Sequence, residues 1–178
     1  MEQKGESRMS NIWIISDTHF GHGNIIRYCN RPFETIKEMD ETMMQNWNKT
    51  VKPEDTVWHL GDVYFHQGHS ALHCLNGRKF LILGNHDNPK DQRLTNIFEE
   101  IMLWKNFRNF GLCFSHMPLH KEQFNFHGLQ NVHGHVHDKD VDKDDMALYN
   151  GKSFNRYRNV CVEKTNYTPI NIDELRIR

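Results

Sequence analysis

The chain has 178 residues, of which 37% are hydrophobic and 25% are charged. This length suits a single domain with a core that needs no disulfide bonds. The composition excludes a disordered, a collagen-like and a membrane-embedded chain. The formal net charge of −1 provides no overall positive field that would hold long nucleic acid by counterion release.

The cysteines and the first residues bear on location and domain organisation. The 4 cysteines are widely spaced and form no CxxC pair, which favours reduced thiols in a cytoplasmic protein. Residues 1–10 are polar and lack the apolar core of a signal peptide. We expect a flexible extension over 1–10, a single domain over 11–178, and no membrane partner.

Short apolar runs rich in β-formers predict strands along the whole chain. The expected strands are 11–16, 56–60, 79–83, 101–104, 111–115, 130–133, 160–163 and 169–172. In the first half they alternate with helices, whereas the second half is mostly strands. This order predicts a layered α/β fold with a mixed sheet.

One helix is predicted over 34–49. Its apolar residues Ile36, Met39, Met43 and Trp47 follow one another at steps of three and four, which places them on one face, with the methionines and the tryptophan packed in the core. We expect further short helices at 70–75 and after Pro89, and a solvated loop over the charged stretch 138–145.

Polar clusters follow the first three predicted strands. Asp17 and His19 end the first, Asp62 the second, and Asn85 with His86 the third. Loops beyond the carboxyl ends of parallel strands gather in one crevice, so we expect these side chains to meet there. Two later clusters follow other strands: Ser115-His116 and Gly134-His135-Val136-His137.

These residue types suit a metal site. In Asp17-x-His19 and His135-x-His137, residues two apart share one side of an extended segment and can reach one cation. Asp62 has two oxygens and can bridge two cations. Nitrogen and oxygen ligands without thiolates favour Mn²⁺, Fe or Zn²⁺ over a structural zinc site.

The ordered set DxH…GD…GNHD…H…GHxH resembles the calcineurin-like metallophosphoesterase superfamily. The segment DTHFGHGNIIRYCNRPF is also similar to that of small bacterial and phage-type members. One departure is visible. Many members have GDxxD or GDxxR, whereas this chain has Phe65 at the last of those positions.

The resemblance implies a four-layer α/β/β/α sandwich with mixed sheets and a site for two divalent metal ions, Mn²⁺ being preferred. One ion would be held by Asp17, His19 and His137, and the other by Asn85, His116 and His135. Asp62 would bridge them. A bridging hydroxide would then hydrolyse phosphate esters, with diesters slightly favoured over monoesters.

The resemblance also places His86 at the leaving group, as a general acid or oxyanion stabiliser. Asp87 either orients His86 or caps a turn. We expect His22, Asn24 and Arg27 to contact the substrate, although Arg27 also fits a surface ion pair. Of the other histidines, His59 and His133 are expected to pack in the core or orient a ligand, and the rest to lie at the surface or around the site: His66, His69, His73, His120 and His127.

Other chemistries find no support in the sequence. It has no GxSxG elbow and no GxxxxGK[ST] phosphate loop. The stretch from Asp138 has Lys143 and Tyr149 where an EF-hand loop needs Gly and Glu.

Two alternatives to a small-ester hydrolase remain. One is a nuclease acting on DNA or RNA ends, and the other is a non-catalytic metal-site scaffold for protein interaction. All seven expected ligands and His86 are present, which favours an enzyme. The expected partner is a small phosphate ester or nucleotide, with no strong nucleic-acid signal and no prediction of the oligomeric state.

Overall fold

The computed structural model describes residues 10–124, 129–141, 144–149 and 152–176. Most of the predicted extension, residues 1–9, and His127 lie outside this range. Within it, no helix is both long and apolar enough to cross a bilayer.

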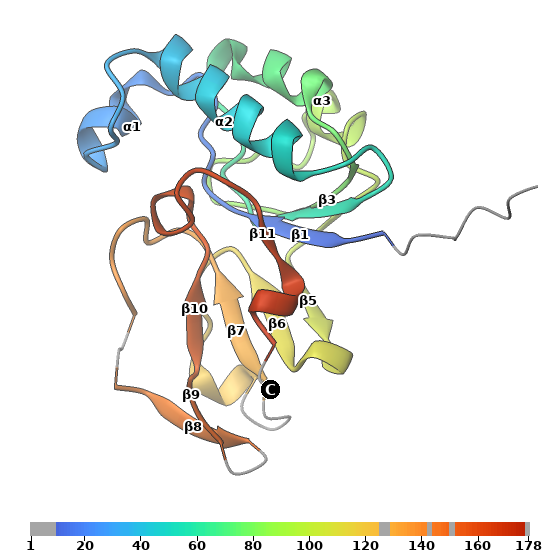
Figure 1. Ribbon diagram of the computed structural model, residues 1–178, viewed down its shortest axis with the longest axis vertical. Coiled ribbons are helices and arrows are strands. Elements are labelled where there is room, and N and C mark those ends of the chain that lie inside the picture. The colour runs from blue at the N-terminus through green and yellow to red at the C-terminus, as the bar shows by residue number, and fades with distance from the viewer. Residues whose placement is uncertain (1–9, 125–128, 142–143, 150–151, 177–178) are drawn as a thin grey trace, which may run out of the picture.

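Two mixed sheets form the centre of the fold (Figure 1). In the first sheet, β1 to β4 run parallel and β11 pairs antiparallel with β1, in the order β11-β1-β2-β3-β4. In the second, β6, β7 and β10 run parallel and β5 is antiparallel, in the order β10-β7-β6-β5. The strands of these sheets are Ile12–Ile15 (β1), Thr56–His59 (β2), Arg78–Ile82 (β3), Glu100–Met102 (β4), Trp104–Phe107 (β5), Leu112–Ser115 (β6), Gln130–His133 (β7), Tyr157–Asn159 (β10) and Ile170–Asn171 (β11).

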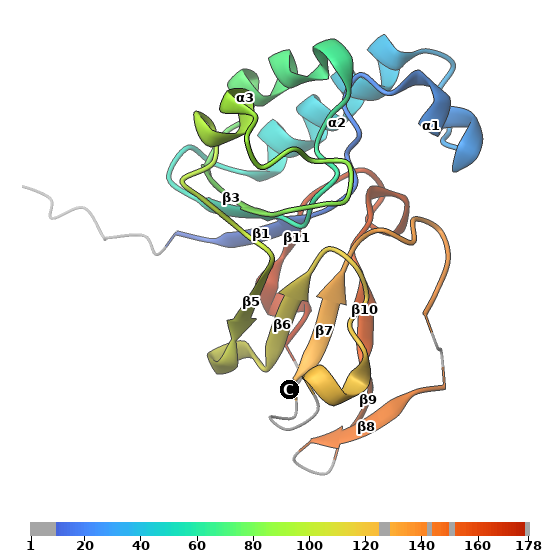
Figure 2. The ribbon, with the colours of Figure 1, turned by 180° about the vertical axis from the view of Figure 1, so that it is seen from behind.

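The helices lie together on one face of the first sheet, and the second sheet lies on its other face (Figures 1 and 2). They are Gly23–Tyr28 (α1), Ile36–Thr50 (α2), Gln92–Thr95 (α3) and a 3-10 helix, His66–Cys74. The α2 helix begins after Thr35, whose side chain accepts a hydrogen bond from the Glu38 backbone N–H at 3.1 Å. This is a normal N-cap, and it confirms the helix predicted over 34–49.

The first sheet separates two apolar clusters of the core. Met39, Met43 and Trp47 of α2 are at most 1% exposed and pack on the first sheet, as predicted. A second apolar cluster fills the space between the two sheets, with Ile14 and Leu60 meeting Phe114 and Val132. Burial of each such side chain contributes roughly 1.5–3 kcal/mol to folding.

The fold class is confirmed: a mixed α/β architecture with parallel sheets. On the far face of the second sheet, the described part of the chain provides a 3-10 turn, Lys121–Gln123, packed near Phe124 and Leu129. The expected fourth layer of α-helix is thus reduced there to a single turn.

Some elements differ from the sequence predictions. The strand expected at 101–104 is divided between β4 and β5, because the chain leaves the first sheet for the second at Leu103. The strand expected at 160–163 lies earlier, as β10, and is followed by a 3-10 turn, Val162–Lys164. Helix α1 and the hairpin of Met146–Tyr149 (β8) and Lys152–Asn155 (β9) had no prediction.

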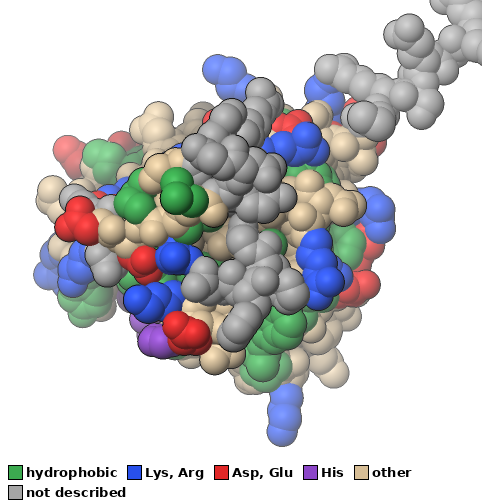
Figure 3. All heavy atoms as spheres, turned by 90° about the horizontal axis from the view of Figure 1, so that it is seen from below, with side chains coloured by type: hydrophobic (Ala, Val, Ile, Leu, Met, Phe, Trp, Pro, Cys, Tyr) green, Lys and Arg blue, Asp and Glu red, His purple; other side chains and the backbone are tan. Residues whose placement is uncertain are grey.

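The surface at the outer end of the second sheet carries charges of both signs. Viewed from below, basic and acidic side chains are interspersed over this face (Figure 3). This distribution agrees with the small net charge of −1 and offers no continuous basic track for a nucleic-acid backbone on the face shown.

Candidate metal centre

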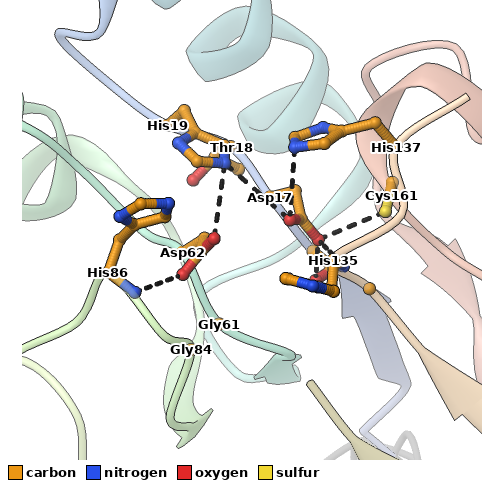
Figure 4. Close-up of polar contacts among 12 residues, drawn as sticks. Asp17, Thr18, His19, Gly61, Asp62, Gly84, His86, His135, His137 and Cys161 are labelled. Carbon is orange, nitrogen blue, oxygen red and sulfur yellow. Dashed lines mark hydrogen bonds and ion pairs between the residues drawn. The ribbon is translucent and has the colours of Figure 1, made fainter. Parts of the chain in front are cut away.

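The candidate ligands follow the carboxyl ends of strands from both sheets. Asp17 follows β1, Asp62 follows β2, and His116 and His135 follow β6 and β7. The loops are tied together by backbone hydrogen bonds, from Asp17 N–H to the Gly61 carbonyl at 3.0 Å and from His19 N–H to the Asp62 carbonyl at 3.1 Å. The side chains of Asp17, Asp62 and His135 therefore lie close together, with those of His19 and His137 beside them (Figure 4).

The backbone at these residues is unusual. Among the described non-glycine residues, positive φ occurs at five candidate ligands: Asp17 (58°), His19 (50°), Asp62 (55°), His135 (68°) and His137 (52°). Left-handed backbone in non-glycine residues is uncommon and clusters at active sites. Here it turns successive side chains inward to a common point.

Two glycines permit the close approach of the loops. A Cβ on Gly84 would lie 2.2 Å from Asp62 Oδ1, and one on Gly134 would lie 2.2 Å from Asp17 Oδ2. Both distances are far below contact, so a side chain at either position would displace a candidate ligand.

The first ligand cluster comprises Asp17, His19 and His137, whose ligand atoms lie within 4.8 Å of one another. His19 Nε2 lies 3.8 Å from Asp17 Oδ1, and His137 Nε2 lies 3.9 Å from the same oxygen. These separations are too long for hydrogen bonds but leave room for a cation about 2 Å from each atom.

The buried polar atoms of this cluster lack partners. Asp17 Oδ1 and both ring nitrogens of His19 are buried with no hydrogen-bond partner. Each such group costs about 1–3 kcal/mol when left unsatisfied. A divalent cation would satisfy Asp17 Oδ1 and one ring nitrogen of His19, Nε2, which faces both Asp17 and Asp62, so the residues fit a metal.

The second ligand cluster comprises Asn85, His116 and His135. His116 Nε2 lies 2.9 Å from Asn85 Oδ1, and the rings of His116 and His135 are 5.2 Å apart. His116 Nδ1 donates to the Leu60 carbonyl at 2.7 Å, which turns Nε2 toward Asn85 and Asp62, where it could bind a metal.

Asp62 lies between the two clusters. Its Oδ2 is 3.6 Å from His19 Nε2 and 3.5 Å from His116 Nε2. Oδ1 accepts a hydrogen bond from the His86 backbone N–H at 2.9 Å. One carboxylate thus faces a histidine of each cluster, which is the position that a bridging ligand needs.

The carboxylates of the site remain ionised. Burial raises the pKa of Asp17, but His19 and His116 counteract it and hold that pKa well below its usual range. Burial also raises the pKa of Asp62, and His116 reverses the shift, so that this pKa is lowered too. Both side chains are therefore available as anionic ligands at neutral pH.

Arg31 and Glu163 brace the first cluster from behind, and sequence reasoning missed both. Arg31 is 4% exposed and donates to the backbone carbonyls of Asp17 (2.7 Å) and Thr18 (2.9 Å). Its Nε also donates to Glu163 Oε1 at 2.9 Å. Because the two residues are 132 positions apart, no local pattern could have paired them.

Glu163 in turn holds His137. Its Oε1 lies 3.1 Å from His137 Nδ1, so that His137 Nε2 points into the first cluster. Burial would lower the pKa of His137, but contacts with Cys29 and Glu163 raise that pKa to about 10. A carboxylate behind a ligating imidazole is the usual support of a metal-bound histidine.

His86 is exposed at the edge of the site and lines its main cavity, which has a volume of about 500 Å³. The expectation that Asp87 orients His86 is wrong. The Asp87 carboxylate accepts hydrogen bonds from the backbone N–H groups of Asp62 (2.9 Å), Val63 (3.0 Å) and Gly84 (2.8 Å). Asp87 therefore caps a turn, which was the alternative role predicted from the sequence, and it joins two ligand loops.

Of the three residues expected at the substrate, only His22 lines the main cavity. Burial and the neighbouring His19 and His86 lower the pKa of His22 to about 4, so this side chain is neutral at pH 7. Asn24 and Arg27 are not among the residues that line this cavity. They pair with each other on α1, where Arg27 donates to Asn24 Oδ1 at 2.9 Å.

Phe65 occupies the position at which this chain departs from the GDxxD or GDxxR pattern of many superfamily members. Its ring stacks on His22 at 4.1 Å and on His19 at 5.4 Å between centroids. An aromatic wall thus stands where many superfamily members have a charged side chain. His59 and His133 lie buried, His59 Nε2 being 2.9 Å from Thr18 Oγ1.

Comparisons with known proteins agree with this geometry. The sequence profile of the calcineurin-like phosphoesterases matches residues 10–171. An uncharacterized protein of Methanocaldococcus jannaschii is 36% identical over 170 residues, covering 93% of this chain and 89% of that protein. The Gene 66 protein of Mycobacterium phage D29 is 28% identical over 163 residues, covering 74% of this chain and 80% of its own.

A solved structure has the same fold. A protein of unknown function from Aquifex aeolicus superimposes with a TM-score of 0.76 and 30% identity, over 94% of this chain and 98% of its own. The profile match and the shared fold both extend over nearly the whole described chain. The chain therefore belongs to the calcineurin-like phosphoesterase family.

Proposed function

We propose that this protein is a two-metal phosphoesterase that hydrolyses phosphodiesters in preference to monoesters. One observation carries the proposal: Asp62 faces a histidine of each ligand cluster, while buried atoms of Asp17 and His19 have no hydrogen-bond partner in the protein. Membership of the phosphoesterase family supports the same reaction. Mn²⁺ is the preferred ion, with Fe and Zn²⁺ as alternatives.

The expected ligand sets are Asp17, His19 and His137 for one ion and Asn85, His116 and His135 for the other, with Asp62 between them. Two bound cations about 3.5–4 Å apart would lower the pKa of water and stabilise charge on the phosphoryl oxygens. The protein's own residues set the rest of the geometry. Arg31 and Glu163 fix the orientation of His137.

His86 is placed to assist the leaving group. It lines the main cavity, and its ring belongs to neither ligand cluster. In its protonated form it would donate a proton to the departing ester oxygen, a role worth typically about 10²–10⁴-fold in rate. The neutral His22 and the ring of Phe65 form the adjacent wall.

The test is hydrolysis of bis(p-nitrophenyl) phosphate and p-nitrophenyl phosphate by metal-stripped protein supplied with Mn²⁺. Asp62→Ala should lose turnover and both tightly bound ions, because one carboxylate serves both. Asp173→Ala, at an exposed carboxylate paired with Arg176, is the matched control. Two tightly bound ions in Asp62→Ala would contradict the bridging role, and metal-loaded wild type without turnover of either ester would favour the scaffold alternative.

A further inference from the structure

A smaller hollow opens beside the second ligand cluster. Its volume is about 260 Å³, and Leu103, Met117 and Leu119 form its apolar wall. The candidate ligands Asn85 and His116 border it, yet none of its lining residues lines the main cavity. The ligand set thus has two separate hollows beside it, with different chemistry.

The apolar wall is held by the elements that hold the ligands. Leu103 lies at the crossing from β4 to β5, and Met117 directly follows His116. Leu103 is 70% exposed and Met117 is 47% exposed. Exposed apolar groups gathered at a concave site favour binding of an apolar ligand group, because its burial releases water from both surfaces.

The size of the hollow argues for part of a substrate rather than a whole one. Pockets for complete small molecules have volumes of roughly 300–1,000 Å³, and 260 Å³ is just below that range. Its lining residues include neither Lys nor Arg, the side chains that usually bind phosphate, which argues against a second phosphate site. It suits one ring or a short hydrocarbon chain.

We propose that this hollow binds the ester group that stays on phosphorus, and that the substrate is a phosphodiester carrying a hydrophobic, ring-sized ester group. This inference rests on the proposed function. His86 lines the main cavity, so the leaving group lies there. Water supplies the oxygen of the new P–O bond and loses a proton to the solvent, the bond to the leaving oxygen breaks with its electron pair, and that oxygen takes the proton of His86, which the solvent then restores.

The retained group takes no part in bond making, so its contribution is binding alone. One methylene in an apolar pocket changes kcat/KM by about 10-fold or more. We therefore expect phenyl p-nitrophenyl phosphate to exceed methyl p-nitrophenyl phosphate at least 10-fold in kcat/KM. Both esters release p-nitrophenol, so only the retained group differs.

Two substitutions test the wall, each with a matched control. Leu103→Ser and Met117→Ser should reduce the phenyl-to-methyl ratio about 10-fold, because each lowers kcat/KM for the phenyl ester far more than for the methyl ester. Leu148→Ser and Met146→Ser alter residues of similar exposure, 76% and 47%, on the β8 hairpin, and should keep the wild-type ratio. All four sites are on the surface, so folding should survive.

A binding measurement separates this inference from catalysis. In protein loaded with diamagnetic Zn²⁺ and labelled at methionine methyl carbons, phenyl phosphate should shift the Met117 signal and not that of Met146. Methyl phosphate should shift neither. An unshifted Met117 signal at saturating phenyl phosphate, or a ratio unchanged in both wall variants, would overturn the inference.

The two proposals fail in different ways. If wild type hydrolyses no ester, the proposed function fails, whatever the methyl signals do. If wild type hydrolyses both diesters at rates insensitive to Leu103 and Met117, only the hydrophobic subsite fails. Loss of self-association in the wall variants, with the ester ratio unchanged, would instead assign this surface to a protein contact.

Discussion

The two ligand clusters differ in how far the protein alone satisfies them. In the first, Asp17 and His19 are 0% and 2% exposed and leave buried atoms unpaired. In the second, the exposed Asn85 hydrogen-bonds His116, so these two ligands partner each other without a cation. In the first cluster an ion would satisfy atoms that the protein leaves unpaired, whereas in the second the protein supplies part of that pairing itself.

The two clusters also differ in the groups that hold their ligands in place. Arg31 and Glu163 brace the first cluster through side chains buried in the interior. The second relies on backbone contacts, with the Leu60 carbonyl holding His116 and the cap of Asp87 holding the Gly84 turn. We expect the first site to bind its ion more tightly and release it more slowly.

The largest expected effect separates chemistry from metal binding. His86→Ala should lower kcat by about 10²–10⁴-fold on an alkyl ester, whose leaving oxygen needs a proton, and much less on a p-nitrophenyl ester. Metal content should remain that of wild type, because His86 belongs to neither cluster. Equal losses on both esters would remove His86 from proton transfer.

The difference between the clusters can be measured directly. His19→Ala should weaken the tightest metal-binding step about 100-fold, because it removes a buried ligand that has no substitute. Asn85→Ala should weaken only the looser step, by roughly 10-fold. Calorimetric titration of metal-free protein with Mn²⁺ resolves the two steps, and similar effects of both changes would mean that the clusters are equivalent.

Removing the charge of Glu163, which contacts His137, should cause a smaller change in metal affinity. Glu163→Gln keeps the shape of the side chain but removes the charge that faces His137 and Arg31. It should weaken the first site about 10-fold with little effect on the second. Glu99→Gln, which alters an exposed ion pair with Arg78, is the control and should leave both sites unchanged.

The smallest effect concerns stability rather than activity. Asp40 accepts hydrogen bonds from the Gly21 backbone N–H beside the first cluster, and burial raises the pKa of its carboxyl to about 6. Asp40 therefore binds more protons in the folded state than in the unfolded state between about pH 4 and 6, and the stability that this carboxyl contributes falls as pH rises through that window. Asp40→Asn should remove this contribution, so that the stability of the variant relative to wild type, measured by denaturant unfolding, rises with pH over the same window; an unchanged difference would contradict the shifted pKa.

Several parts of the molecule were predictable because their signals are local. The helix over 34–49 follows from apolar residues spaced for one face, and β1 to β3 follow from short apolar runs that end in polar loops. Convergence of Asp17, Asp62 and Asn85 follows from the parallel arrangement, since parallel strands present their carboxyl ends at one edge. The division at Leu103 was not predictable, because a continuous apolar run does not show where a chain changes sheets.

The roles of single residues depended more on contacts across the fold. Asp87 resembles an imidazole partner in sequence, yet three backbone N–H groups within reach capture its carboxylate. Arg27 resembles a phosphate ligand, yet helix α1 places it beside Asn24. Which partner a charged side chain takes depends on distances of a few ångströms, and these are not encoded in local spacing.

Residue type and short-range order along the chain were enough to establish the family resemblance, the candidate ligands and the mixed α/β class. The packed structure was needed to show that Asp62 lies between the clusters, that Arg31 and Glu163 support one of them, and that an apolar hollow borders the other. Those relations join residues far apart along the chain, and they arise from how the two sheets pack.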